Sequence, residues 1–117
     1  MLLLLLTLPC VGQSLEGTWR TSGVLPPSGP NGQPFSWMKE YTFYPDGTYL
    51  MTGYPPIEDR GSYEITTMAA SGWKVRLFNR IFQNEPAVEA TLQLRWDPFG
   101  KFFTVGDDRY DKTQPTP

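Results

Sequence analysis

The sequence predicts an all-β domain, an antiparallel up-and-down meander of about eight short strands that closes into a barrel. Residues 88–96 alternate strictly between apolar and polar side chains, which is typical of a strand with one buried and one wet face. Turn-forming residues separate short β-rich runs along the chain, and no stretch has the apolar spacing of an amphipathic helix. Connections of hairpin length favour a meander over a Greek key, and closure removes exposed sheet edges.

The first elements are a short strand at residues 17–20 and then a long loop at residues 22–34. The loop prediction follows from four prolines, which cannot take part in a regular ladder. Loops of this length without structure of their own are often lids or mobile crossings.

A hairpin around Pro45-Asp46-Gly47 is the clearest local unit. Pro45 presets φ for the first turn position, and Gly47 accepts the positive φ that closes the turn. The flanking runs are aromatic and β-branched, which predicts strands at residues 36–44 and 48–53. Residues 54–59 contain two adjacent prolines, so we expect an extended, polyproline-like connection there.

The remaining strands are expected at residues 61–67, 73–82, 88–96, 101–105 and 109–112. Trp73, Val75 and Leu77 alternate with polar residues, so they are predicted to share the buried face of their strand. Residues 113–117 contain two prolines and are expected to form a disordered tail.

Composition places the chain among single-domain globular proteins. Its 117 residues allow one core, and an aromatic content of 15% is enough to fill it. A formal net charge of −2 and a pI near 5.0 argue against nucleic-acid binding, which needs a clustered basic face.

The N-terminus resembles a secretory signal peptide. An apolar run is followed by Pro9 and small residues, which predicts a signal segment at 1–14, a barrel domain at 15–112, and export to the periplasm or the extracellular space. The run is too short for a membrane span, and a buried first strand or a misplaced start are the alternatives. Lipid anchoring through Cys10 is less favoured because proline precedes the cysteine directly.

Three short motifs resemble those of lipocalin-like domains of secreted bacterial proteins. Gly17-Thr18-Trp19 is similar to the Gly-x-Trp signature of that family, and residues 45–49 and 61–65 follow its hairpin pattern. The resemblance implies a calycin-type barrel in which Arg109 packs over Trp19 through a cation–π contact worth about 0.5–2 kcal/mol. A surface ion pair of Arg109 with a neighbouring aspartate is the equally favoured alternative. The chain is shorter than a typical lipocalin and has no C-terminal helix pattern, so a cavity for a large lipid is not expected.

The residue inventory argues against catalysis. The chain has no histidine, which excludes Ser-His-Asp and Cys-His arrangements and the commonest zinc ligand. Glu58-Asp59 and Asp107-Asp108 are adjacent pairs whose members point to opposite faces of a strand, so neither pair converges. Residues 107–111 lack the spacing of a known calcium loop. We therefore expect no enzyme activity, no catalytic residue, no metal and no cofactor.

The aromatic residues are the remaining functional candidates, since they either fill the barrel interior completely or line an open pocket. If a pocket exists, a mouth beside the loop 22–34 is expected. The predicted ligand-binding residues are Trp37, Tyr41, Phe43, Tyr63 and Trp73. The predicted structural residues are Gly17, Trp19, Gly47 and Arg109.

Together these features predict an exported, monomeric, non-catalytic binding module for a small hydrophobic molecule, without a membrane span. The alternative is a plugged barrel that acts as a structural component or binds another envelope protein through its loops. A third hypothesis, an enzyme on the same barrel, rests only on scattered carboxylates and tyrosines.

Overall fold

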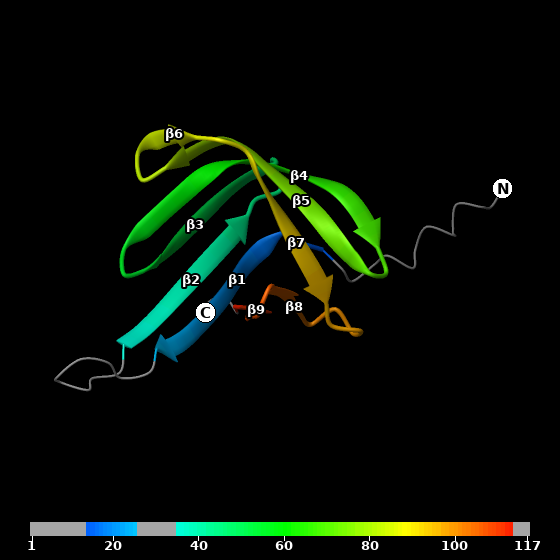
Figure 1. Ribbon diagram of the computed structural model, residues 1–117. Helices are drawn as coiled ribbons and strands as arrows, with labels where there is room; N and C mark the ends of the chain where they lie inside the picture. The colour runs from blue at the N-terminus through cyan, green and yellow to red at the C-terminus, as the bar shows by residue number, and fades with distance from the viewer. Residues whose placement is uncertain (1–13, 26–34, 114–117) are drawn as a thin grey trace.

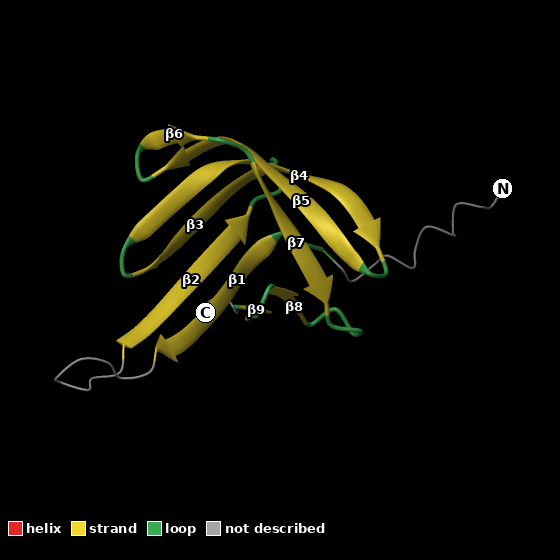
Figure 2. Ribbon diagram, viewed as in Figure 1, coloured by secondary structure: helices red, strands yellow, loops and turns green. Residues whose placement is uncertain are grey.

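The described part of the chain consists of strands, turns and loops. The computed structural model describes residues 14–25 and 35–113, and Figure 2 shows strands joined by loops within them, with no helix. The strands are β1 (Gly17–Leu25), β2 (Phe35–Phe43), β3 (Thr48–Tyr54), β4 (Ile57–Ala69), β5 (Gly72–Phe82), β6 (Glu85–Ala87), β7 (Ala90–Trp96), β8 (Phe102–Val105) and β9 (Asp108–Lys112). The all-β prediction is confirmed. Nearly all of the predicted signal segment, residues 1–13, lies outside the described residues, as does the tail after Thr113.

The strands form one antiparallel sheet that closes on itself (Figure 1). Their order is β4-β3-β2-β1-β9-β8-β7-β5-β6, and an additional pairing of β4 with β5 closes a ring of eight strands. The short β6 is the extra strand, which pairs with the end of β5 beyond β7. The predicted meander and its closure are therefore confirmed, and the barrel is of the general kind that the lipocalin resemblance implies.

The first hairpin is longer than the sequence predicted. β1 and β2 pair without interruption from Gly17↔Phe43 to Leu25↔Phe35, so the loop expected at residues 22–34 is wrong for residues 22–25. The first proline of this predicted loop is Pro26, so residues 22–25 can take part in the ladder. The rest of that predicted loop, residues 26–34, lies outside the described residues.

The two following turns differ in how well they were predicted. At the β2–β3 turn Gly47 has a φ of 90°, as expected, and Asp46 accepts hydrogen bonds from the backbone nitrogen and the hydroxyl of Thr48. The β3–β4 connection is instead much tighter than the expected polyproline-like segment 54–59, because Gly53 already pairs with Ile57. Only Pro55 and Pro56 separate the two strands, and neither has a backbone N–H that a ladder would have to satisfy.

The core occupies the inside of the barrel, where alternate residues of each strand meet. Its buried members are Leu15, Trp19, Tyr41, Phe43, Tyr49, Met51, Trp73, Val75, Leu77, Leu94, Phe103 and Tyr110. Leu15 precedes β1, and its backbone oxygen accepts a hydrogen bond from the indole nitrogen of Trp19 at 2.9 Å. We call this end of the barrel, which also carries the β2–β3, β4–β5 and β7–β8 turns, the closed end.

The opposite end is less completely walled. β9 pairs with β1 at only two positions, Trp19↔Lys112 and Arg20↔Asp111, and β8 pairs with β7 only at Arg95 and Trp96. The short β8 and β9, orange to red in Figure 1, therefore wall the barrel next to Trp19, and among the described residues the last part of β1 has no partner strand on that side. We call this end, which carries the β3–β4 connection and the β8–β9 turn, the mouth.

Candidate ligand-binding site

A pocket of about 550 Å³ opens at the mouth. Its lining comes from β2, from the β3–β4 connection and from the starts of β4 and β9, together with Gln83 after β5. These residues are Trp37, Met38, Lys39, Tyr54, Pro55, Pro56, Ile57, Gln83 and Asp108. Ligand sites commonly have volumes of about 300–1,000 Å³ and a mostly apolar lining with a few polar groups. This mouth pocket has the size and composition of a small-molecule site.

Trp37 packs against a glycine on the neighbouring strand. It pairs with Gly23 on β1, and a Cβ atom added to Gly23 would lie 2.8 Å from the Trp37 ring. The indole therefore lies directly against the backbone of β1, in a position that any other residue at 23 would obstruct. This packing leaves Trp37 half-buried at the pocket wall, where one face of the ring is supported by protein.

A charged pair lies deeper in the barrel, one inward-facing position beyond Ile57. Asp59 on β4 is only 3% exposed, and Arg80 on β5 donates to its carboxylate from Nε at 3.3 Å and from Nη2 at 3.1 Å. Arg80 also donates from Nη1 to the backbone oxygen of Val88 at 2.8 Å. A buried carboxylate is tolerated when it is paired and hydrogen-bonded, and Asp59 meets both conditions.

Tyr49 completes this cluster. Its hydroxyl donates a hydrogen bond to Asp59 Oδ1 at 2.8 Å. Burial raises the pKa of Tyr49, and the hydrogen bond to Asp59 raises it further. Tyr49 thus keeps its proton at neutral pH and acts as a donor to the carboxylate. Because Asp59 already accepts hydrogen bonds from Arg80 and Tyr49, we interpret the cluster as a structural support for the barrel wall beneath the mouth pocket.

The structure does not bring the five predicted ligand-binding residues together. Trp37 lines the mouth pocket, whereas Tyr41 and Phe43 are buried, with their rings stacked at 5.6 Å. Tyr63 packs edge-on against Phe43 at 5.0 Å and donates its hydroxyl to a backbone oxygen. Trp73 lies toward the closed end, beside a separate and more polar hollow of about 680 Å³ between β4, β5, β7 and β8.

Aromatic rings fill the closed end. Trp19 contacts Trp96 at 5.5 Å and Phe103 at 4.9 Å, and Trp96 contacts Trp73 at 5.2 Å. The stacked rings of Phe103 and Tyr110, 5.3 Å apart, continue the cluster toward the mouth. Of the two alternatives for the aromatic residues, the described interior around these rings therefore follows the filled one, and the more apolar of the two hollows lies at the mouth.

Arg109 and Trp19 are not in contact through the cation–π pair that the lipocalin resemblance implied. The Arg109 guanidinium lies 3.6 Å from the centre of the Phe102 ring and forms an ion pair with Asp111 at 2.9 Å, which was the alternative. Lys112 takes the place over the tryptophan, with Nζ 5.5 Å from the ring centre. Gly17 leaves room for it, because a Cβ at Gly17 would lie 2.8 Å from Lys112 Cε.

Sequence reasoning missed Lys39, Ile57, Arg80 and Asp108 as residues of this region. Arg80 was hidden by an irregularity in β5, where Asn79 has a φ of 51° and the register with β4 shifts between Arg60 and Ser62. Strict alternation from Leu77 would point residue 79 inward and residue 80 outward, and a bulge reverses this. Asp59 and Asp108 carried a usable signal, since each is the inward-facing member of an adjacent acidic pair.

No match to this chain is found among protein-family models, curated proteins or solved structures. In residues 14–25 and 35–113, no three His, Cys, Asp or Glu side chains are grouped so that they could hold a metal ion. The same residues include no helix with the length and apolar character needed to cross a membrane.

Proposed function

We propose that the protein is an exported, monomeric, non-catalytic binding module of the lipocalin type that holds a small apolar ligand in its mouth pocket. The observation that carries the proposal is the pocket of about 550 Å³ with Trp37 and Ile57 in its wall. An apolar ligand that enters it removes these side chains from water, and each Å² of apolar surface so buried contributes about 25 cal/mol.

The mouth is favoured over the interior because the closed end is already occupied by side chains. Trp19, Trp96 and Phe103 contact one another there, which leaves that part of the barrel to the core. The ligand is therefore expected to be small and only partly enclosed.

The test is a titration of the full chain with N-phenyl-1-naphthylamine, an uncharged apolar dye whose fluorescence rises in apolar surroundings. We expect saturable binding of one dye per chain. Trp37→Ala should weaken it by about tenfold or more, because an aromatic side chain at the centre of a contact often contributes over 1.4 kcal/mol.

Phe99→Ala is the matched control. Phe99 is 83% exposed and lies in the β7–β8 turn at the closed end, so its loss should leave dye affinity unchanged. Circular dichroism should show that both variants are folded. Equal affinity of wild type and Trp37→Ala, or absence of dye binding to the folded wild type, would contradict the proposal.

The second candidate is a barrel that binds another envelope protein through its loops, and the filled closed end is the observation that favours it. This candidate needs a contiguous exposed apolar patch. Among the described residues, the large exposed apolar side chains are instead divided, with Tyr54, Phe82 and Val88 at or beside the connections at the mouth and Tyr44, Met68 and Phe99 toward the closed end. This division is the reason that we prefer the small-ligand function.

A further inference from the structure

Two buried tyrosines lie beneath the mouth pocket. Tyr41 on β2 is 9% exposed, Tyr110 on β9 is 3% exposed, and their ring centres are 5.7 Å apart. Within residues 14–25 and 35–113, neither hydroxyl donates to or accepts from a protein atom. By contrast, Tyr49 donates to Asp59 and Tyr63 donates to the backbone. A buried hydroxyl without a partner costs about 1–3 kcal/mol, so a partner from outside the protein is expected.

Both hydroxyl oxygens keep some surface that a water-sized molecule can reach. The fully enclosed side-chain polar atom without a partner in the described part of the chain is Trp96 Nε1, so the oxygens of Tyr41 and Tyr110 each keep some accessible surface. They are therefore neither sealed into the packed core nor satisfied by it.

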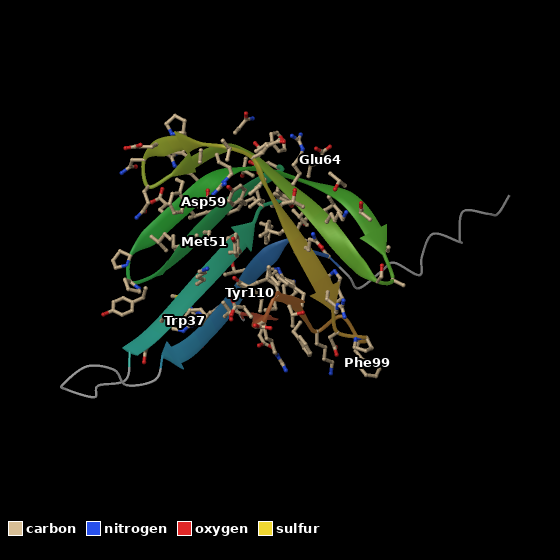
Figure 3. The ribbon with its side chains drawn as sticks, viewed as in Figure 1. Trp37, Met51, Asp59, Glu64, Phe99 and Tyr110 are labelled. Atoms are coloured by element: carbon tan, nitrogen blue, oxygen red, sulfur yellow. The ribbon has the colours of Figure 1, made fainter. Side chains whose placement is uncertain are left out.

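Both tyrosines lie one inward-facing position deeper than residues of the mouth pocket, whose lining includes neither of them. Lys39 and Asp108 line the pocket, and Tyr41 and Tyr110 follow them by two residues on the same faces of β2 and β9. Asp59 has the same relation to Ile57 on β4. Figure 3 labels Trp37, Asp59 and Tyr110 on these three strands. We call these deeper residues, Tyr41, Tyr110 and Asp59, the polar floor beneath the pocket.

The tyrosines offer donors to a ligand. Burial raises the pKa of Tyr41 to about 12, and burial also raises the pKa of Tyr110, so both hydroxyls are protonated at neutral pH. The charge of Asp59 adds to the raised pKa of Tyr41, and Tyr41 and then Asp108 add to that of Tyr110.

The charges around the floor favour an uncharged ligand. Lys39 and Asp108 at the pocket wall have opposite charges, and Asp59 is neutralised by Arg80 at 3.1 Å. Lys39 and Asp108 lie at the pocket wall, so an ionised group that passed them to reach the tyrosines would lose its hydration and would find the Asp59 charge already paired with Arg80. A carbonyl oxygen accepts two hydrogen bonds and brings no donor that would itself need a partner.

We propose that the ligand is an uncharged molecule with a carbonyl group on an apolar chain, and that its carbonyl oxygen accepts hydrogen bonds from Tyr41 and Tyr110 while its chain lies against Trp37 and Ile57. This inference rests on the proposed function, because it assigns the ligand class of the same pocket.

The experiment is displacement of N-phenyl-1-naphthylamine, which has no oxygen, from the full chain by three chains of equal length: undecan-2-one, undecane and undecanoate. The ketone should displace the dye at a concentration about tenfold lower than the alkane, as expected for one to two net hydrogen bonds. Undecanoate should be weaker than the ketone at neutral pH.

Combining Tyr41→Phe with Tyr110→Phe should abolish the advantage of the ketone over the alkane. Tyr44→Phe is the matched control, because this half-exposed residue lies at the closed-end turn, and it should keep the advantage. Each single variant is measured as well, in case the double variant fails to fold.

The outcomes separate the two proposals. If the dye binds and needs Trp37, but ketone and alkane compete equally, or undecanoate competes best, or the folded phenylalanine variants keep the ketone preference, the carbonyl inference is wrong and the proposed function stands. If the folded wild type does not bind the dye, or Trp37→Ala binds it equally well, the proposed function fails and the carbonyl inference fails with it.

Discussion

The indole nitrogen of Trp19 donates to the backbone oxygen of Leu15 at 2.9 Å, and this bond ties the residues before β1 to the closed end of the barrel. Leu15 is buried with Trp19, although it precedes the first strand. Its burial means that the packed core extends to a residue before the first strand. Trp19 therefore stabilises the closed end through this hydrogen bond as well as through the volume of its ring.

Trp19→Ala should destabilise the protein by about 3–5 kcal/mol. The change leaves a cavity among Trp96 and Phe103 and removes the donor that holds Leu15. Urea denaturation followed by far-ultraviolet circular dichroism measures the free energy of unfolding. A folded variant with near wild-type stability would show that Trp19 does not anchor this end.

Gly47→Val should weaken the β2–β3 turn by about 1–3 kcal/mol. A Cβ at Gly47 meets no atom within 4 Å, so the cost comes from the φ of 90° alone, which β-branched residues resist. Gly47→Asn is the matched variant, because asparagine tolerates positive φ better and should cost less. Equal stability of the valine and asparagine variants in urea would contradict this explanation.

The fold could be predicted from the sequence because its signals are local. The alternation in residues 73–77 and the turn chemistry at Pro45-Asp46-Gly47 depend on near neighbours, and both β5 and the β2–β3 turn lie where these patterns indicate. The end of β1 was missed because one proline-rich segment was assigned to a loop as a whole, although Val24 and Leu25 precede its first proline.

The candidate site could be predicted only in part because it depends on distant strands. Trp37 and Trp73 both lie near the start of a strand, but β2 begins at the mouth and β5 begins at the closed end, so one pocket cannot contain both. The contact between Asp59 and Arg80 depends on the bulge at Asn79, which reverses the faces of the residues after it. Neither the composition nor the periodicity of the sequence indicates this bulge.

Asp59→Ala should destabilise the protein by about 3–5 kcal/mol, because it leaves the largely buried Arg80 without its counter-charge and Tyr49 without its acceptor. Arg80→Met should cost a similar amount, since it leaves an unpaired buried carboxylate. The double variant should lose less than the sum of the two single variants, and urea denaturation of all four proteins measures this coupling. Strictly additive losses would show that the two side chains do not stabilise each other.

Stability should fall at alkaline pH, because the buried tyrosines then differ in protonation between the folded and the unfolded state. The folded pKa of Tyr41 is about 12, whereas an unfolded tyrosine titrates near pH 10. The contribution of Tyr41 is therefore fully present below about pH 10 and is lost as pH rises from about 10 to about 12, at up to about 1.4 kcal/mol per pH unit. The free energy of unfolding in urea, measured from about pH 8 to about pH 11, should decrease more steeply for wild type than for Tyr41→Phe. The other titratable side chains are present in both proteins, so the difference in slope reports Tyr41 together with its effect on Tyr110. Parallel pH profiles would show that Tyr41 titrates in the folded protein as it does in the unfolded chain.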